Sequence, residues 1–280
     1  MKKINNLILV SVVASSVMMF SCVSKSSGKT TNEEVVDTPL VKSSVPSPIE
    51  TFEVNGVKFD MIAVEGGTFT MGATKEQMDE AKEFEFPAHK VTLDSYCIGK
   101  TEVTQSLWKA VMGVENNPSA MKGDNLPVEN ISWIDCQEFI NKLNALTGHT
   151  FRLPTEAEWE FAARGGNKSL GYKYSGSNDI LDVAWIMETS EGTQPVATLR
   201  PNELGIYDMS GNVYEWCSDW FDYYNDGLQT NPKGPASSGY RVTRGGSWSG
   251  FAGGCRVSFR FFTEPDFAIF NLGLRLASDK

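Results

Sequence analysis

The segment from Ser249 to Phe270 is the part of this sequence that most restricts how the chain can fold. It contains many phenylalanines among glycines and serines, with no helical period and only patchy alternation. The phenylalanines are Phe251, Phe259, Phe261, Phe262, Phe267 and Phe270. A core strand would not need so many glycines, and a solvated loop would not carry so many large apolar side chains. The pattern therefore favours an irregular recognition surface, and a buried, loop-rich edge of the core is the alternative.

Length and composition are those of an ordinary globular protein. The chain has 280 residues, of which 41% are hydrophobic and 21% are charged, so it can bury a sizeable core. Its formal net charge of −10 argues against a nucleic-acid partner, because contacts to phosphates need a basic patch. Few helix signals in a long, loop-rich chain predict a single α+β domain.

The N-terminus has the pattern of an export signal. Lys2 and Lys3 precede an apolar run over residues 7–20 that is too short to span a bilayer, and Ser21-Cys22 follows it. This arrangement resembles a bacterial lipobox, in which Cys22 is lipidated; an ordinary cleaved secretion signal is the alternative. We therefore expect a signal peptide over residues 1–21 and a membrane lipoprotein, placed in the outer membrane and exposed at the cell surface.

A flexible tether is expected over residues 22–50, because this stretch is rich in Ser, Thr, Pro and Lys and contains no aromatic residue. The folded domain is then expected over residues 51–280. It contains four cysteines, whose spacing fits no dense disulfide framework, so we favour buried free thiols over two disulfides. These cysteines are Cys97, Cys136, Cys217 and Cys255.

Local signals predict one hairpin and three helices. Asn55-Gly56 supplies the positive φ angles of a tight turn within a hairpin over residues 52–62. Thr104 can cap one helix, and a second follows Ser132, which has Asp135 three residues later. Thr155, with Glu158 three residues later, begins the third. Short strands are expected over residues 69–71 and over 91–98, the latter interrupted at Asp94-Ser95.

Several sequence motifs occur in the order typical of one family. They include Thr101-Glu102-Val103-Thr104, Arg152-Leu153-Pro154-Thr155, Gly211-Asn212-Val213-Tyr214-Glu215-Trp216, Arg244-Gly245-Gly246-Ser247-Trp248 and Leu272-Gly273-Leu274-Arg275. Together these motifs resemble the formylglycine-generating-enzyme, or sulfatase-modifying factor, domain, which is a branch of the C-type-lectin-like fold. The resemblance implies a loop-rich α+β domain with short strands and few helices.

The resemblance also bears on catalysis. The enzymes resembled convert a substrate cysteine to formylglycine with copper held by two cysteines, five positions apart, after the Gly-Gly-Ser-aromatic run. Gly250 stands at the first of these positions and Cys255 at the second, so one thiolate is missing and no copper is expected. A second enzymatic branch binds iron through three histidines, whereas this chain contains only His89 and His149. We therefore expect a protein that is not an enzyme.

One metal site is carried over from the resemblance. The residues Asp208, Gly211, Val213 and Glu215 match a calcium loop of the enzymes resembled, with two side-chain carboxylates and two backbone carbonyls as ligands. Oxygen ligands on a tight, glycine-containing loop suit Ca²⁺. The alternative is a turn in which the two carboxylates only accept hydrogen bonds from backbone amides.

The chain is most similar to the ligand-binding variable lipoproteins that retroelements diversify. In those proteins the variable region follows the Gly-Gly-Ser-Trp run, and its varied codons encode residues such as Ser, Gly, Phe and Ile but not Lys or Glu. The resemblance implies that a protein or glycan ligand contacts Trp248, Ser249, Gly250, Phe251, Gly253, Gly254, Phe259, Phe261, Phe262, Phe267, Ile269 and Phe270. The framework of the segment would be Cys255, Arg256, Arg260, Pro265 and Gly273.

The sequence thus predicts a surface-displayed binding protein that is anchored to the membrane through Cys22. One alternative is a formylglycine-generating or related oxidoreductase that acts on a secreted protein, and another is a structural module whose Phe-rich segment contacts a second subunit. An enzyme requires an accessible thiolate at Cys255 with a perturbed pKa, whereas a binding protein leaves that thiol buried.

Overall fold

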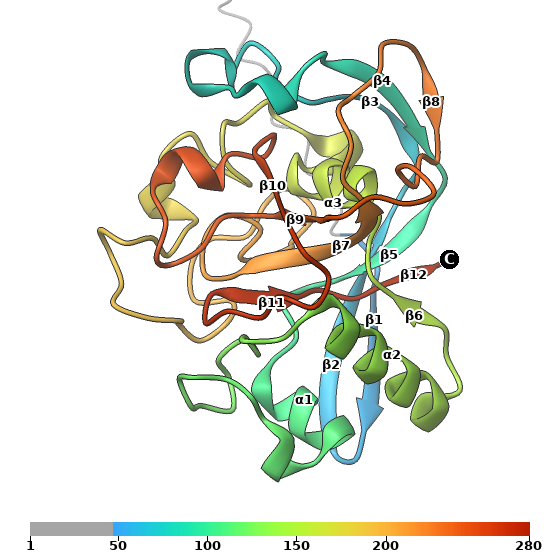
Figure 1. The fold of residues 1–280 in the computed structure, drawn as a ribbon, viewed down its shortest axis with the longest axis vertical. Coiled ribbons are helices and arrows are strands. Elements are labelled where there is room, and N and C mark those ends of the chain that lie inside the picture. Colours follow the sequence, from blue (N-terminus) through green and yellow to red (C-terminus); the bar gives the residue numbers. More distant parts are fainter. Residues whose placement is uncertain (1–46) are drawn as a thin grey trace, which may run out of the picture. The chain divides into compact units, whose positions relative to one another are not determined.

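The computed structural model describes residues 47–280 (Figure 1), so the expected signal peptide, Cys22 and most of the expected tether lie outside the described residues. The first strand, β1 (Ile49–Val54), forms a hairpin with β2 (Val57–Val64). It begins two residues before the expected domain boundary, because Ile49 and Glu50 already pair with β2. Asn55 and Gly56 have φ angles of 49° and 83°, which confirms the predicted turn.

The largest sheet has five antiparallel strands and contains both the first and the last strand of the described chain. Its order is β1, β2, β5 (Tyr96–Gly99), β12 (Ala277–Asp279) and β6 (Phe151–Arg152). The C-terminal strand β12 therefore lies between β5 and β6, and this sheet joins the two ends of the domain.

Two smaller sheets complete the strand framework. The four-stranded sheet has the order β10 (Arg260–Thr263), β9 (Arg241–Arg244), β7 (Tyr214–Trp220) and β11 (Leu272–Leu274), with β10 at one edge. The three-stranded sheet has the order β3 (Gly67–Met71), β4 (His89–Leu93) and β8 (Gln229–Thr230). The predicted strand region over residues 91–98 is thus divided between two sheets, because the chain turns at Asp94-Ser95.

All three predicted helices are present with the predicted starts. They are α1 (Gln105–Met112), α2 (Trp133–Thr147) and α3 (Glu156–Ala163). The Thr104 side chain accepts a hydrogen bond from the Leu107 amide, and capping boxes begin α2 and α3. Short 3₁₀ helices occupy several connections: η1 (Met78–Glu80), η2 (Glu83–Glu85), η3 (Val114–Asn116), η4 (Gly166–Lys168), η5 (Ile180–Asp182) and η6 (Ala252–Cys255). Every residue of α3 is buried, so this helix lies inside the domain.

The apolar core has two main parts. One surrounds Trp159 and Phe161 of α3, and the other lies between α1, α2 and the β1–β2 hairpin around Trp108 and Phe139. All four cysteines of the described chain are free and buried, which confirms the preference for free thiols. Within residues 47–280, no helix is both long and apolar enough to cross a membrane. The predicted α+β class, rich in loops and poor in helices, is confirmed.

Candidate functional site

The Phe-rich segment, residues 249–270, contains the short helix η6 and the edge strand β10, and most of its phenylalanines are exposed. The exposed fraction of the side chain is 67% for Phe251, 47% for Phe261, and 44% for both Phe267 and Phe270. Phe262 is half-buried and stacks on Phe221, with ring centroids 3.9 Å apart. The segment is therefore a surface at most of its phenylalanines and an edge of the core at Phe262.

Ring contacts connect two of the exposed phenylalanines, Phe261 and Phe270, to neighbouring elements. The ring of Phe270 contacts Trp248 at a centroid distance of 5.6 Å, and the ring of Phe261 contacts Tyr214 of β7 at 6.0 Å. The Asn271 carbonyl accepts a hydrogen bond from the Tyr214 amide at 2.8 Å. We call Phe251, Phe261, Phe267 and Phe270, together with Trp248 and Tyr214, the aromatic face.

Two members of the expected contact set besides Phe262 are partly buried, and one residue of the aromatic face was not in that set. Phe259 is half-buried and contacts Phe84 at a centroid distance of 6.0 Å, while Ile269 packs against the core around α2. Burial of these side chains reduces the surface that they can present to a ligand. Tyr214 belongs to the aromatic face but has no expected ligand role, because its motif has the pattern of framework and only the β7–β10 arrangement brings it to Phe261. The remaining expected positions, Ser249, Gly250, Gly253 and Gly254, are partly exposed.

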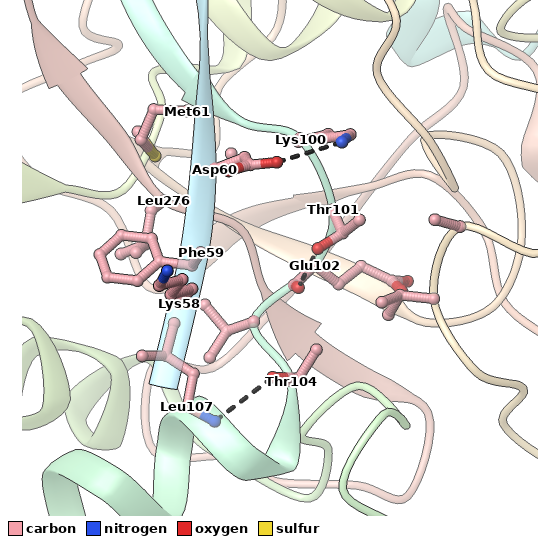
Figure 2. A pocket seen from close by; sticks show the side chains of 14 residues that line it. Lys58, Phe59, Asp60, Met61, Lys100, Thr101, Glu102, Thr104, Leu107 and Leu276 are labelled. Carbon is pink, nitrogen blue, oxygen red and sulfur yellow. Dashed lines mark hydrogen bonds and ion pairs between the residues drawn. The ribbon is translucent and has the colours of Figure 1, made fainter. Parts of the chain in front are cut away.

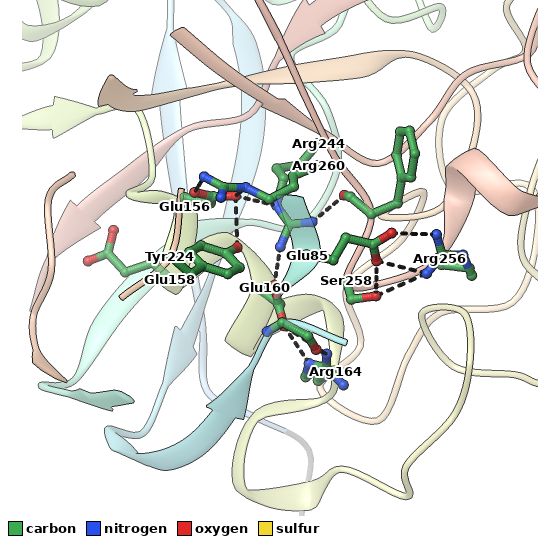
Figure 3. A network of polar contacts seen from close by, with 12 residues as sticks. Glu85, Glu156, Glu158, Glu160, Arg164, Tyr224, Arg244, Arg256, Ser258 and Arg260 are labelled. Atoms are coloured by element: carbon green, nitrogen blue, oxygen red, sulfur yellow. Dashed lines mark hydrogen bonds and ion pairs between the residues drawn. The ribbon is translucent and has the colours of Figure 1, made fainter. Parts of the chain in front are cut away.

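A network of buried ion pairs holds the Phe-rich segment from beneath (Figure 3). Arg256 donates two hydrogen bonds to Glu85, of 2.7 and 2.8 Å, and Arg260 donates two to Glu156, of 2.6 and 2.7 Å. Arg244 of β9 pairs with Glu160 of α3. Burial raises the pKa of Glu85, but hydrogen bonds from Arg256 and Ser258 outweigh that effect and hold the pKa below its ordinary value. The structure thus supports the expected framework role of Arg256 and Arg260.

Cys255 lies inside this framework. Its thiol is fully buried, and burial raises its pKa to about 12, so the thiolate is scarce at neutral pH. The partner position of the copper-binding pair is occupied by Gly250, and the other described cysteines are buried at separate places in the core. The residues described here therefore do not supply two thiolates to one metal ion.

The expected calcium loop is a cluster of buried carboxylates. Glu215 is bonded to Arg275, with an Nη2–Oε1 distance of 2.6 Å, and accepts the indole N–H of Trp159 at 2.6 Å. Asp208 accepts a hydrogen bond from the Ala197 amide at 2.7 Å, and burial raises its pKa to about 6. Asp208 therefore has the backbone-amide partner that the turn alternative predicts, whereas the partners of Glu215 are the side chains of Arg275 and Trp159. Within residues 47–280, no group of three or more His, Cys, Asp or Glu side chains is arranged to hold a metal ion.

A third carboxylate, Glu102, extends this cluster. Glu102 accepts hydrogen bonds from the Val213 amide at 3.1 Å and from the Asn212 side chain at 2.8 Å. Burial, followed by the charges of Asp208 and Glu215, raises its pKa well above the ordinary value. Glu102 and Ala197 also line a pocket of about 280 Å³ (Figure 2), so the pocket reaches the cluster. An excess of buried carboxylates over the single cation Arg275 is chemically compatible with a hard divalent cation.

The three sheets, the buried α3 helix and the loop-rich C-terminal face define a domain with the C-type-lectin-like fold of formylglycine-generating enzymes. The chain belongs to the family of the sulfatase-modifying factor enzyme 1-like domain, which matches residues 47–280.

Relatives of this chain include proteins with different described roles. The chaperone protein LppX of Paenibacillus barcinonensis is 34% identical over 254 residues, which cover 72% of this chain and 83% of LppX. The formylglycine-generating enzyme of Streptomyces coelicolor is 34% identical over 198 residues, covering 61% of this chain and 60% of the enzyme. Matched chlamydial serine/threonine-protein kinases are longer, and the matched region spans only 41–42% of their length.

A solved structure confirms the resemblance to variable proteins. Treponema denticola variable protein 1 has a TM-score of 0.75 and 33% sequence identity to this chain, and the match covers 83% of this chain and 99% of that protein.

Proposed function

We propose that this protein is a non-catalytic binding protein that presents the aromatic face to a protein or glycan ligand. The observation that carries the proposal is the separation of roles within one segment: four phenylalanines are exposed, while Arg256 and Arg260 between them are buried in ion pairs. Clustered exposed aromatic residues are typical of interaction sites. The similarity to Treponema denticola variable protein 1 supports this proposal.

The proposal includes variation of the contact positions and display at the cell surface. A framework built on buried arginines tolerates changes at the exposed positions between them, because those side chains contribute little to the core. The lipobox-like sequence at Cys22 supports a lipid anchor. The enzyme alternative is weaker, because Gly250 replaces one thiolate and Cys255 is buried with a raised pKa. The subunit alternative requires self-association at low concentration, which sedimentation velocity would detect.

Replacing single phenylalanines of the segment by serine tests the proposal without knowledge of the ligand. We expect Phe251→Ser, Phe261→Ser, Phe267→Ser and Phe270→Ser each to lower the free energy of unfolding by no more than about 1 kcal/mol, because surface changes cost little. Phe262→Ser should cost about 2–4 kcal/mol, because its ring stacks on Phe221 against the core. Urea denaturation measures the free energy of unfolding of each variant. Losses of several kcal/mol in most exposed variants would identify the segment as core and defeat the proposal.

We also propose that Ca²⁺ binds the loop of Asp208, Gly211, Val213 and Glu215. The excess of buried carboxylates supports this, although Glu215 is already bonded to Arg275. A cation bound only to the folded state stabilises it by mass action, by about 2.7 kcal/mol at a concentration one hundred times Kd. A chelator should therefore lower the Tm by several degrees, and Asp208→Ala should remove this response.

The control for the calcium prediction is Asp124→Ala, which removes an exposed carboxylate and should leave the response to chelator unchanged. If Asp208→Ala and the unaltered protein respond equally to chelator, the metal is bound elsewhere. If neither responds, the turn alternative holds.

A further inference from the structure

The exposed charges of the Phe-rich segment have one sign. Four charged residues lie between Ser249 and Phe270, and the two cations among them, Arg256 and Arg260, are buried and paired with Glu85 and Glu156. The other two, Glu264 and Asp266, are exposed, and neither forms an ion pair with any residue in the described chain. The segment therefore presents phenylalanine rings and unpaired carboxylates to solvent.

The elements beside the segment also expose a carboxylate, and their cations have partners. The Met187 amide donates a hydrogen bond to the Gly250 carbonyl at 3.1 Å, and the next residue, Glu188, is exposed. Two cations on residues whose backbone pairs with the segment are engaged. Lys173, whose carbonyl accepts the Val257 amide, pairs with Glu80. The guanidinium of Arg241, which is opposite Thr263, lies 3.8 Å from the ring centroid of Trp133 and 3.5 Å from that of Trp220. Among the described residues, these neighbours thus add a further carboxylate, and both of their cations already have partners.

The small polar side chains beside the aromatic face are already bonded to one another. The Asn271 amide donates to the Ser249 hydroxyl at 2.8 Å, and the hydroxyls of Ser247 and Ser249 are 3.3 Å apart. A glycan needs hydrogen bonds from side chains of this kind to its hydroxyls, and those bonds would have to replace the existing ones. This arrangement favours a ligand that is recognised by apolar contact and charge.

We propose that the ligand of the aromatic face is a protein segment that combines apolar residues with arginine or lysine; this inference rests on the function proposed above. Apolar side chains of such a segment pack among the phenylalanines, and its cations meet Glu264, Asp266 and the faces of the aromatic rings. Guanidinium and ammonium groups are attracted to ring faces, and charge complementarity speeds association and selects partners.

The test compares three probes by fluorescence anisotropy with the full-length protein. They are a labelled peptide of Arg-Leu-Ser repeats, its Glu-Leu-Ser counterpart and a neutral chitin oligosaccharide. We expect the cationic peptide to bind at least about tenfold more tightly than the other probes, and several-fold more weakly at about 0.5 M salt than at about 0.05 M salt, because salt screens exposed charges.

Matched variants test whether the carboxylates beside the aromatic face cause the preference for the cationic peptide. Glu264→Gln combined with Asp266→Asn should lower the affinity for the cationic peptide by about threefold to tenfold. Glu50→Gln combined with Glu53→Gln removes the same charge from β1, which lies in another sheet, and should change that affinity by less than about twofold. Phe261→Ser combined with Phe270→Ser should abolish binding.

Each other outcome overturns the cationic-partner inference, the binding function proposed above, or both. Equal affinity for both peptides, binding of the oligosaccharide alone, binding of no probe, or equal effects of the two carboxylate pairs would overturn the cationic-partner inference. The binding function itself would stand wherever the Phe261→Ser and Phe270→Ser pair still removed the binding of a probe. If that pair left probe binding unchanged, both the inference and the function proposed for this face would fall.

Discussion

Replacing Arg256 by methionine is expected to lower the free energy of unfolding by about 3–5 kcal/mol, because it leaves the carboxylate of Glu85 buried without its partner. The side chains of both residues are fully buried. Arg256 also donates hydrogen bonds to the carbonyls of Gly253 at 2.9 Å and Glu80 at 3.1 Å, and these would be lost as well. Urea denaturation of the variant and the unaltered protein measures the difference.

Two further variants show whether the expected loss of stability arises because the pair of Arg256 and Glu85 is buried. Arg200→Met breaks a partly exposed pair with Asp182, whose shortest N–O distance is 3.6 Å, and should cost less than about 1 kcal/mol. Removing both partners with Arg256→Met and Glu85→Met should recover part of the loss, because no unpaired charge stays buried. If Arg256→Met costs no more than Arg200→Met, Arg256 is not part of the framework beneath the aromatic face.

Asp219 is expected to make the protein less stable as the pH rises from about 4 to about 7. Its side chain is 4% exposed, and burial, followed by the charge of Glu156, raises its pKa to about 7 from the ordinary 3.8. Because the pKa is higher in the folded state, the stability contributed by protonated Asp219 is complete below pH 4 and is lost as the pH rises through about 7. The full effect is about 4 kcal/mol at 1.4 kcal/mol per pKa unit.

Comparison with Asp219→Asn isolates this effect, because asparagine does not titrate and its carbonyl can still accept the Glu156 amide hydrogen bond of 3.0 Å. Between pH 5 and pH 8 the variant should gain about 2–3 kcal/mol relative to the unaltered protein. Urea denaturation at both pH values measures this. The exposed Asp226→Asn variant is the control and should show no such gain. Parallel stability curves for Asp219→Asn and the unaltered protein would contradict the prediction.

Features that depend on neighbouring residues could be predicted from the sequence alone. Thr104, Ser132 and Thr155 begin helices because their side chains accept bonds from amides three residues ahead. The turn at Asn55-Gly56 forms for an equally local reason, since these residues tolerate positive φ angles. The order of the motifs also identified the family correctly, because each motif is short and contiguous in the chain.

The division of the phenylalanines into exposed and half-buried side chains was decided only by the tertiary structure. Phe261 and Phe262 are adjacent and their ring centroids are 5.8 Å apart, yet only Phe262 stacks on Phe221, while Phe261 stays exposed and contacts Tyr214. The patchy alternation of the sequence did not show that a strand begins at Arg260 and pairs with β9.

The charged framework was likewise decided by the tertiary structure. Arg256 and Glu85 are 171 positions apart, and Glu102 and Asn212 are 110 positions apart. The sequence by itself determined the helix starts, the hairpin turn and the family. Only the folded chain decided which carboxylate each buried arginine meets and which phenylalanines remain in water, because these outcomes depend on segments that are distant in the sequence and share no local pattern.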